Sequence, residues 1–396
     1  MKAKILIVSP MPPIPPRSGA QMRLFQFLAF LKDSFQLHFC ALSAEPMTGE
    51  CMAQLDAWGV AASTVIHRPS GTRWSILARQ PRCVAAYDNR EMHRLLKKLA
   101  VHWEPAIIQY EFLWMAQYAG HRGAARTVLV EHDAEHVGMA RFAARMQGIR
   151  RIAGRLEAVK TLRYERRMLS RFDTVVALTG TDADRLGRLV PGQRIEVIGQ
   201  GVDLEHFRPD PGDEPCEGLV FIGDLRHFPN RDAMRIFCQE YLPKIQQRVG
   251  VVAFHIVGRD PGEDVLRLRE LPGVTVHADV TDVAPFLKNA RAFVCPMFCG
   301  GGMRGKLLEA MAAGTPVITN RMCCEGVPLV DGRHALVAET PDEFAHAVER
   351  LFSNRSFAAA VALQARRLVE SAFAWETQAE LQARIYERLL SGRNLE

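Results

Sequence analysis

The sequence lacks the cysteine pairs, long apolar runs and repeats that mark several classes of protein. Its nine cysteines are odd in number, scattered and without a C-x-x-C pair, which predicts reduced thiols in the cytoplasm rather than a disulfide framework. No stretch approaches the roughly 20 apolar residues of a membrane span, and the apolar run in the opening MKAKILIVSPMPP is too short for a secretory signal. With 29 Gly and 22 Pro in 396 residues, a disordered or fibrous chain is excluded.

Two common nucleotide-binding motifs are absent from the first strand-to-helix connection. After a predicted strand at 5–9, residues 10–20 read PMPPIPPRSGA, with neither G-x-G-x-x-G nor G-x-x-x-x-G-K-[ST]. NAD-dependent enzymes and P-loop ATPases are therefore disfavoured. Gly19 lies near a predicted helix start, where a backbone N–H can meet an anion or a hydroxyl. A proline-stiffened connection without a ligand is the alternative interpretation.

Composition and length indicate two folded domains. The chain is 48% apolar and 24% charged over 396 residues, enough for a sizeable core and more than one ordinary domain. The formal net charge is +6, yet ten Arg or Lys against two Glu lie between Arg141 and Arg171, an excess of eight positive charges. The rest of the chain is slightly acidic. This distribution argues against nucleic acid as a partner and favours one face that meets an anionic surface.

The basic segment has the pattern of an amphipathic helix. Apolar residues recur at helical spacings between the arginines: Ile149, Ile152, Leu156, Val159, Leu162 and Leu169. One interpretation is a helix whose apolar stripe faces the core and whose basic back is solvated. The other is docking of residues 141–171 on an anionic membrane surface.

Short β-branched runs alternate with helical patterns throughout the chain. Each run is continuously apolar, as in parallel strands buried on both faces. The predicted strands are 5–9, 37–41, 63–67, 106–109, 127–131, 174–177 and 196–198, and then 219–222, 253–257, 275–277, 292–295, 317–319 and 335–338. The Pro- and acid-rich stretch 209–215 between the two sets resembles a linker. Two α/β units with parallel sheets follow, and ligands are expected at the carboxyl ends of their strands.

The most informative segment follows the predicted strand at 292–295. Gly300, Gly301 and Gly302 allow close approach of a ligand to the backbone, a helix is predicted to start at Gly302, and Arg304 and Lys306 add two positive charges. This combination predicts a diphosphate site. Glu309, further along the helix, can accept hydrogen bonds from a ribose diol. A glycine-rich turn with solvated Arg and Lys is the alternative.

At this segment the sequence resembles GT-B glycosyltransferases of the retaining GT4 type, whose pattern runs E-G-x-G-x-x-x-x-E-A-M-A-x-G-x-P-V. Residues 197–209, VIGQGVDLEHFRP, are similar to the family's V-I-P-N-G-V-D-x-x-x-F-x-P. FIGDL at 221–225, together with Pro229-Asn230, resembles the opening of its second domain. The resemblance implies an α/β GT-B fold with two Rossmann-like, doubly wound domains facing a cleft. It implies an N-terminal acceptor-side domain at 1–195, a linker at 196–217, a nucleotide-sugar domain at 218–372 and a returning helix at 373–396.

The resemblance also assigns roles to individual residues. Glu309 would hold the ribose, while Gly223 and Arg226 would lie near the donor phosphates, with Arg231 a weaker candidate. His132 would position the donor sugar. Met303 lies within the donor segment, and Glu325 opens a stretch similar to the family's E-G-L…D-G, so both are further donor-binding candidates.

Two positions depart from the family pattern. The family's paired glutamates stand eight apart, but Gly301 occupies the position eight before Glu309. A variant subgroup with G-G-G-x-R-x-K, relying more on Arg304 and Lys306, is the better comparison. Gln200 replaces the usual Asn.

Residues 132–136 also spell H-x-x-E-H, an inverted zinc-peptidase motif. Such a site needs both histidines on one helical face. Here His132 directly follows a predicted strand, so His132 and His136 are expected to straddle a strand end and a helix start, with Glu135 between them. Glu111, at the end of another predicted strand, is a candidate for positioning an acceptor hydroxyl or a plain helix-terminal charge.

The expected function is transfer of a sugar from a UDP- or GDP-sugar to a glycan or lipid-linked acceptor, in polysaccharide or glycolipid assembly. Catalysis is assigned to His132, Arg304, Lys306 and Glu309. No metal or cofactor is expected, because no D-x-D element follows a strand in a place that would demand a metal ion. The expected place is the cytoplasm, including the cytoplasmic face of the inner membrane. A non-catalytic nucleotide-sugar-binding relative and a zinc hydrolase at His132, Glu135 and His136 are the alternatives.

Overall fold

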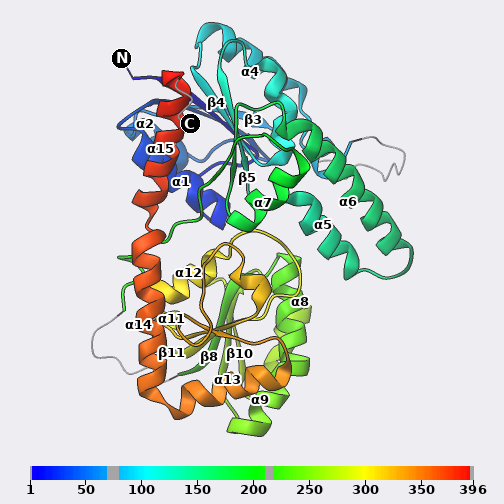
Figure 1. Ribbon diagram of the computed structural model, residues 1–396, viewed down its shortest axis with the longest axis vertical. Coiled ribbons are helices and arrows are strands. Elements are labelled where there is room, and N and C mark those ends of the chain that lie inside the picture. Colours follow the sequence, from blue (N-terminus) through cyan, green and yellow to red (C-terminus); the bar gives the residue numbers. More distant parts are fainter. Residues whose placement is uncertain (1, 69–79, 210–216, 393–396) are drawn as a thin grey trace. The chain divides into compact units, whose positions relative to one another are not determined.

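The computed structural model describes residues 2–68, 80–209 and 217–392 (Figure 1). Residues 210–216, which include most of the Pro- and acid-rich stretch of the predicted linker, lie outside the described residues. The chain divides into two compact units. The first comprises Met1–Gln200 together with Glu376–Glu396, and the second comprises Gly201–Trp375. Each unit is described by itself below.

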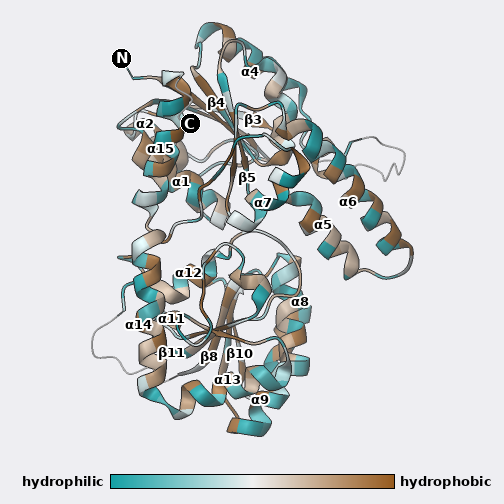
Figure 2. Ribbon diagram, viewed as in Figure 1, coloured by the Kyte–Doolittle hydropathy of each residue, from teal (hydrophilic) through white to brown (hydrophobic). Residues whose placement is uncertain are grey.

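The first unit is built on a seven-stranded parallel sheet with strand order β3-β2-β1-β4-β5-β6-β7. Its strands are β1 Lys4–Ser9, β2 Gln36–Ser43, β3 Ala61–Ile66, β4 Ile107–Glu111, β5 Arg126–Glu131, β6 Thr174–Ala177 and β7 Ile195–Val197. Each of the seven runs predicted in this half overlaps one of these strands. The inner strands are brown in Figure 2, consistent with apolar runs covered by helices on both faces.

The second unit has a six-stranded parallel sheet with strand order β10-β9-β8-β11-β12-β13. Its strands are β8 Glu217–Asp224, β9 Phe254–Arg259, β10 Val274–Ala278, β11 Ala290–Cys295, β12 Val317–Thr319 and β13 Leu336–Val337. All six predicted runs are strands. In both units the strand order reverses beside the first strand, between β1 and β4 and between β8 and β11. Ligands of doubly wound sheets bind at such a switch point.

Helices connect the strands in both units. In the first unit they are α1 Gly19–Leu31, α2 Gly49–Ala57, α3 Arg82–Ala85, α4 Arg90–His102, the 3-10 helix η1 Leu113–His121, α5 Glu135–Ala144, α6 Gly148–Leu169 and α7 Gly180–Leu189. In the second unit they are α8 Phe228–Ile236, the π-helical turn η2 Phe237–Tyr241, α9 Leu242–Val249, α10 Glu263–Leu266, η3 Arg267–Glu270, α11 Ala284–Asn289, α12 Gly305–Ala312, η4 Arg321–Cys324, α13 Pro341–Ser353 and α14 Arg355–Ala372. No helix of the described residues is long and apolar enough to cross a bilayer.

The last helix, α15 Trp375–Ser391, packs on the first unit although it follows the second in the chain. Its Tyr386 hydroxyl donates a hydrogen bond to Oε1 of Gln109 in β4 at 2.6 Å, and Arg388 pairs with Glu196 in β7 at 2.7 Å. The Tyr386 ring also meets Phe35 edge-on at 5.3 Å. These contacts reach the buried strand β4 and the edge strand β7, so α15 is an integral part of the first unit.

Helix α6 does not pack as the first interpretation of its sequence, an apolar stripe that faces the core, expects. Ile149, Ile152, Leu156 and Val159 are exposed, and the buried face consists of smaller and polar residues such as Ala153, Gly154, Ala158 and Thr161. An apolar stripe facing the core is therefore wrong for this part of the helix. Periodicity identified two faces, but the face that packs on α5 is the one with small side chains, which allow two helices to approach closely.

Candidate functional site

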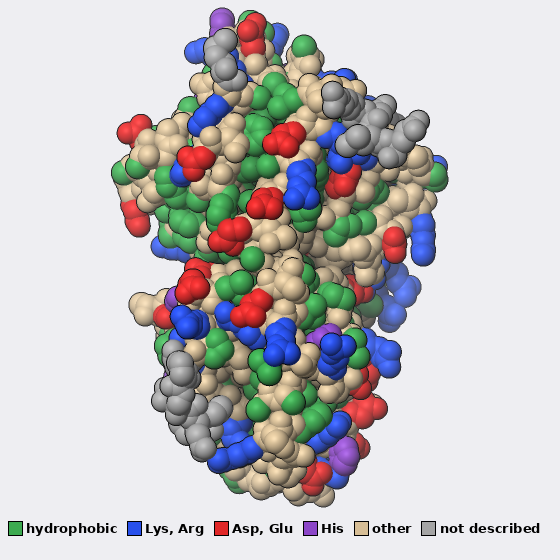
Figure 3. Space-filling view, turned by 60° about the vertical axis from the view of Figure 1, so that its left-hand side comes forward, with side chains coloured by type: hydrophobic (Ala, Val, Ile, Leu, Met, Phe, Trp, Pro, Cys, Tyr) green, Lys and Arg blue, Asp and Glu red, His purple; other side chains and the backbone are tan. Residues whose placement is uncertain are grey.

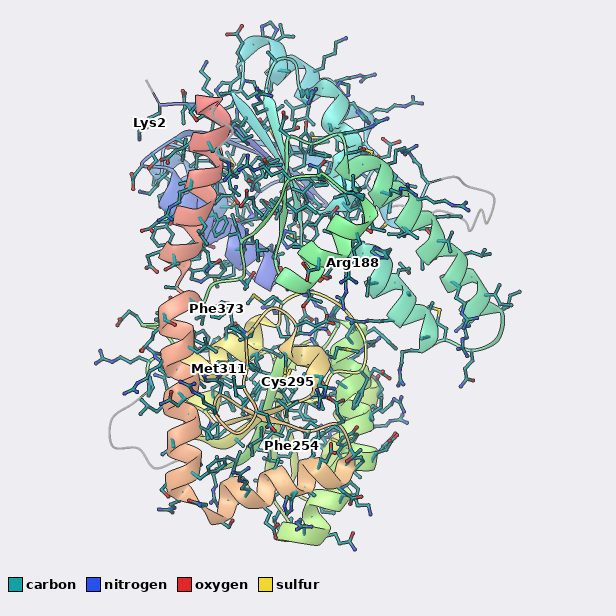
Figure 4. All side chains as sticks on the ribbon, in the orientation of Figure 1. Lys2, Arg188, Phe254, Cys295, Met311 and Phe373 are labelled. Carbon is teal, nitrogen blue, oxygen red and sulfur yellow. The ribbon has the colours of Figure 1, made fainter. Side chains whose placement is uncertain are left out.

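A glycine-rich connection follows β11 at the switch point of the second unit. Cys295, labelled in Figure 4, ends β11, and helix α12 begins at Gly305. Gly300 and Gly302 have φ of 96° and 67°, left-handed values that residues with a Cβ disfavour. Arg304 has φ −93° and ψ 88° and is the N-cap. The helix start predicted at Gly302 is therefore wrong: the left-handed turn delays the helix to Gly305.

Arg304 presents hydrogen-bond donors that the protein does not satisfy. Its Nη1 donates to the carbonyl oxygen of Gly301. Its Nε and Nη2 are buried and have no hydrogen-bond partner among the described residues. Leaving a buried polar group unpaired costs about 1–3 kcal/mol, and more when the group is charged. A ligand with acceptor oxygens would supply the missing partners.

Lys306 lies beside Arg304 and is held by uncharged groups. Its Nζ donates to Oδ1 of Asn230 at 2.7 Å and lies 4.2 Å from the ring centroid of Phe221. Asn230 is fixed in turn, because its Nδ2 donates to the backbone oxygen of Asp224 at 2.8 Å. Burial lowers the pKa of Lys306, and the charge of Arg304 acts in the same direction. Among the described residues no carboxylate forms an ion pair with either cation, so both charges can act on an anion.

Gly223, in β8, leaves the space that the lysine ammonium occupies. A Cβ added to Gly223 would lie 2.9 Å from Nζ of Lys306 and 3.0 Å from Nδ2 of Asn230. Any side chain at this position would therefore displace the ammonium from its partner. Gly223 shapes the site by close approach of the backbone, not by contributing a charge.

We call Gly223, Asn230, Arg304 and Lys306 the anion site. It combines two cations, N–H groups of a glycine-rich turn, and the amino end of α12 with its partial positive charge. This arrangement suits a diphosphate. Asn230 was not singled out from the sequence as a site residue, although the Pro229-Asn230 pair that the family resemblance includes was the signal that could have found it.

Glu309 lies on α12 one turn beyond Lys306 and is half-buried. Burial raises the pKa of its carboxyl to about 7, while Lys306 and His206 partly oppose the shift. The carboxyl therefore changes its charge near neutral pH. It can accept hydrogen bonds from a diol when ionised and loses part of that capacity when protonated.

Three other predicted donor residues have different surroundings. Arg226 donates two hydrogen bonds to the carboxylate of Asp224, from Nη2 at 2.6 Å and from Nε at 3.0 Å. This contact raises the pKa of Arg226, whose charge is therefore already paired with Asp224. Met303 packs against the core of the second unit, and Glu325 directly follows η4. Their roles in donor binding stay predictions.

A second cluster lies at the carboxyl ends of β4 and β5 in the first unit. His132, which follows β5, is buried with its Nε2 2.8 Å from Oε2 of Glu111, the last residue of β4. The other oxygen of Glu111 accepts a hydrogen bond from Nε2 of Gln109 at 2.5 Å. Burial lowers the pKa of His132 more than Glu111 raises it. A neutral imidazole that donates Nε2–H to Glu111 keeps Nδ1 as an acceptor.

Phe112 holds the imidazole from one face. Its ring stacks on His132 with centroids 3.7 Å apart and an interplanar angle of 9°. Its φ of 71° is unusual for a residue with a Cβ. Backbone strain of this kind persists where surrounding structure enforces it, often at functional sites. The structure thus fixes His132 by a hydrogen bond and by stacking. The predicted residues of the glycine-rich segment belong to the second unit: Gly300 to Gly302, Arg304, Lys306 and Glu309.

The two histidines of the H-x-x-E-H motif have different partners. His132 precedes α5 and bonds to Glu111, whereas His136 lies in α5 and its Nδ1 bonds to Oε2 of Glu165 in α6. The expectation that the pair straddles a strand end and a helix start is confirmed. In the part of the chain that the structure describes, no group of three or more His, Cys, Asp or Glu is placed to hold a metal ion.

The first strand-to-helix connection is hydrogen-bonded to Gln200, where the first chain segment of this unit ends. Gly19 is the first residue of α1, and its carbonyl accepts a hydrogen bond from Nε2 of Gln200 at 2.8 Å. Gln200 thus has a positioning role that sequence reasoning missed. Arg23, also missed, is only 1% exposed and donates to the carbonyl oxygen of Gly199. Burial lowers the pKa of Arg23 to about 10.

Comparison with known families gives two matches that together span most of the chain. A model described as Glycosyltransferase Family 4 matches residues 18–206, and one described as Glycosyl transferases group 1 matches residues 217–354. The chain is also 28% identical, over 96% of each chain, to a GDP-mannose-dependent alpha-(1-6)-phosphatidylinositol monomannoside mannosyltransferase of Mycobacterium tuberculosis.

Solved structures share the fold at low sequence identity. Sucrose-phosphate synthase from Thermosynechococcus elongatus superposes with a TM-score of 0.75 at 15% identity, covering 99% of this chain and 100% of that one. Anabaena HepE in complex with UDP-glucose superposes with a TM-score of 0.69 at 15% identity, covering 97% of this chain and 99% of that one. At such identities the likeness concerns the fold.

Proposed function

The chain is a GT4-like glycosyltransferase with the GT-B fold, and from this premise we propose that it transfers a sugar from a UDP- or GDP-sugar to a glycan or lipid-linked acceptor with retention of anomeric configuration. The predicted fold class and enzyme class are confirmed. Donor, acceptor and stereochemistry belong to the proposal.

The unsatisfied guanidinium of Arg304 carries the proposal. When the bond between the anomeric carbon and the diphosphate oxygen breaks, negative charge collects on the leaving diphosphate. Arg304, with two buried unpartnered donors, and Lys306, whose only hydrogen-bond partner in the described part of the chain is Asn230, are placed to bind that charge together with the amino end of α12. Their charge also supports a mechanism without a metal ion.

The names of two similar proteins bear on the identity of the donor and of the acceptor. The mycobacterial relative is named for GDP-mannose and a phosphatidylinositol monomannoside, while the Anabaena structure holds UDP-glucose. We therefore retain both bases and propose a lipid-linked or glycan acceptor in polysaccharide or glycolipid assembly. Because Gly301 replaces the first glutamate of the family pattern, we assign a larger share of donor binding to Arg304 and Lys306. We assign His132 to positioning of the donor sugar.

A panel of UDP- and GDP-sugars tests the proposal. The purified protein is incubated with each donor and with lipid-linked and soluble glycan acceptors, with and without EDTA. We expect release of UDP or GDP with one donor, unchanged by the chelator, and NMR of the product should show the donor's anomeric configuration. Inverted product or loss of turnover in EDTA would overturn those parts of the proposal. Tight donor binding without any release of diphosphate would leave only a binding function.

The pKa of Glu309 gives a test of the ribose contact. Its carboxyl, with a pKa of about 7, is ionised above that pH and protonated below it, so donor affinity should rise as pH increases from 6 to 8. Calorimetric titration with an intact sugar nucleotide measures this cleanly, since its diphosphate carries no proton that titrates in this range. Glu309→Gln, which is neutral throughout, should remove the pH dependence. The same slope in the variant would exclude Glu309 as its source.

A further inference from the structure

The face of α6 that packs against α5 consists of small residues, so the larger aliphatic residues of α6 lie on its exposed face. A Cβ added to Gly154 would lie 2.8 Å from Cβ of Ala143 in α5, so the two helices approach closely at small residues. Figure 1 shows α5 and α6 side by side as a helical hairpin of the first unit. This close packing occupies one face of α6 and leaves the opposite face without a partner helix among the described residues.

That opposite face carries an apolar ridge. Its members are Ile149, Ile152, Leu156 and Val159, with exposed fractions of 80%, 61%, 45% and 43%. Their spacing of three, four and three residues places them in one stripe of the helix. Single exposed aliphatic residues are ordinary, but four in one stripe form a contiguous patch of the kind that marks an interaction site.

An arginine border accompanies the apolar ridge along α6. It consists of exposed arginines along the same helix, none of which pairs with a carboxylate of a described residue: Arg150, Arg151, Arg155, Arg163, Arg166 and Arg167. The two acidic residues of α6 do not offset this charge at the surface. Glu165 is buried against His136, and Glu157 pairs with Lys160 and accepts a hydrogen bond from the backbone N–H of Arg82. By contrast, both signs of charge are interspersed over the face shown in Figure 3.

We propose that the apolar ridge and the arginine border dock the protein on an anionic lipid bilayer. The aliphatic side chains would enter the boundary between headgroups and acyl chains, and the arginines would contact lipid phosphates, the arrangement of an interfacial amphipathic helix. A second copy of the same face is disfavoured because its arginines would repel. Single-stranded nucleic acid is disfavoured because the ridge offers no aromatic ring for base stacking. The cytoplasmic face of the inner membrane is the matching surface.

Binding of the full chain to vesicles tests this proposal independently of sugar transfer. We expect sedimentation with vesicles of phosphatidylcholine and phosphatidylglycerol at equal parts, at least tenfold tighter than with phosphatidylcholine alone, and weakened by 0.5 M NaCl. The variant Arg151→Glu with Arg155→Glu should lose at least tenfold in affinity. The variant Ile149→Ser with Ile152→Ser should bind weakly and lose insertion into a lipid monolayer.

Matched control variants carry the same changes elsewhere. Val251→Ser with Leu363→Ser alters residues that are 75% and 50% exposed in the second unit, and Arg269→Glu with Arg367→Glu reverses two exposed arginines there. These should bind vesicles like the unaltered protein, and every variant should keep its melting temperature. Equal binding to both kinds of vesicle, or equal loss in the controls, would overturn the proposal. Lipid-free self-association that the Ile149 and Ile152 variant abolishes would assign the face to a second copy instead.

Discussion

Replacing Arg304 by alanine is expected to lower kcat/KM for sugar transfer by about a hundredfold to a thousandfold, the usual effect of removing one preorganised donor to a developing negative charge. The guanidinium has two buried nitrogens, Nε and Nη2, without an acceptor in the described part of the chain. Its removal should therefore change the stability of the folded protein little and destabilise the transition state strongly. The measurement is steady-state kinetics with the donor found in the panel, together with calorimetric binding of UDP or GDP.

Two observations accompany the Arg304 prediction. Arg304→Lys should recover only part of the activity, because an ammonium cannot reproduce the planar donor geometry of a guanidinium. The alanine variant should melt within a few degrees of the unaltered protein, which distinguishes loss of the site from loss of the fold. Near-normal turnover of Arg304→Ala would remove the anion site from the mechanism.

Replacing Lys306 by methionine is expected to have an effect of similar size. Methionine can keep the apolar contact with Phe221 while removing the charge 2.7 Å from Asn230. Because burial already lowers the pKa of Lys306, the neutral side chain should not destabilise the fold. We expect weaker binding of UDP or GDP and at least a hundredfold lower turnover, measured in the same two assays.

Gly223→Ala provides a steric counterpart that keeps every charge. The added methyl would lie 2.9 Å from the lysine ammonium, and a flexible lysine can move away at little cost to stability. Diphosphate affinity should therefore fall about tenfold while the melting temperature is retained. Unchanged affinity in Gly223→Ala and in Lys306→Met would show that the ammonium does not contact the donor.

The arrangement of strands could be predicted from the sequence because each buried strand is a short apolar run between helical patterns. The runs at 5–9 and 219–222, for example, became β1 and β8. The charged side chains of the anion site and the nearby Glu309 could be predicted for a similar reason. Arg304, Lys306 and Glu309 share one glycine-rich segment, so their proximity is local and requires no knowledge of tertiary contacts.

Tertiary contacts account for what the sequence did not predict. Asn230 reaches Lys306 from 76 positions away, and Gln200 reaches Gly19 from 181 positions away. Three adjacent glycines gave no signal for where α12 begins, since glycine allows both the left-handed turn and the helix. In α6 the pattern revealed two faces without saying which one packs, because small residues pack as well as large ones when a neighbouring helix is close.

The position of helix α15 has a consequence for the order of folding during synthesis. Tyr386 donates a hydrogen bond to Gln109, which in turn donates to Glu111, the partner of His132. The ribosome completes the entire second unit before it reaches residues 376–392. Domains usually fold in the order in which they emerge, but here the first unit must wait for a late helix before the hydrogen bonds behind His132 are complete. The hydrogen bonds behind His132 can therefore be completed only after the whole second unit has been synthesised.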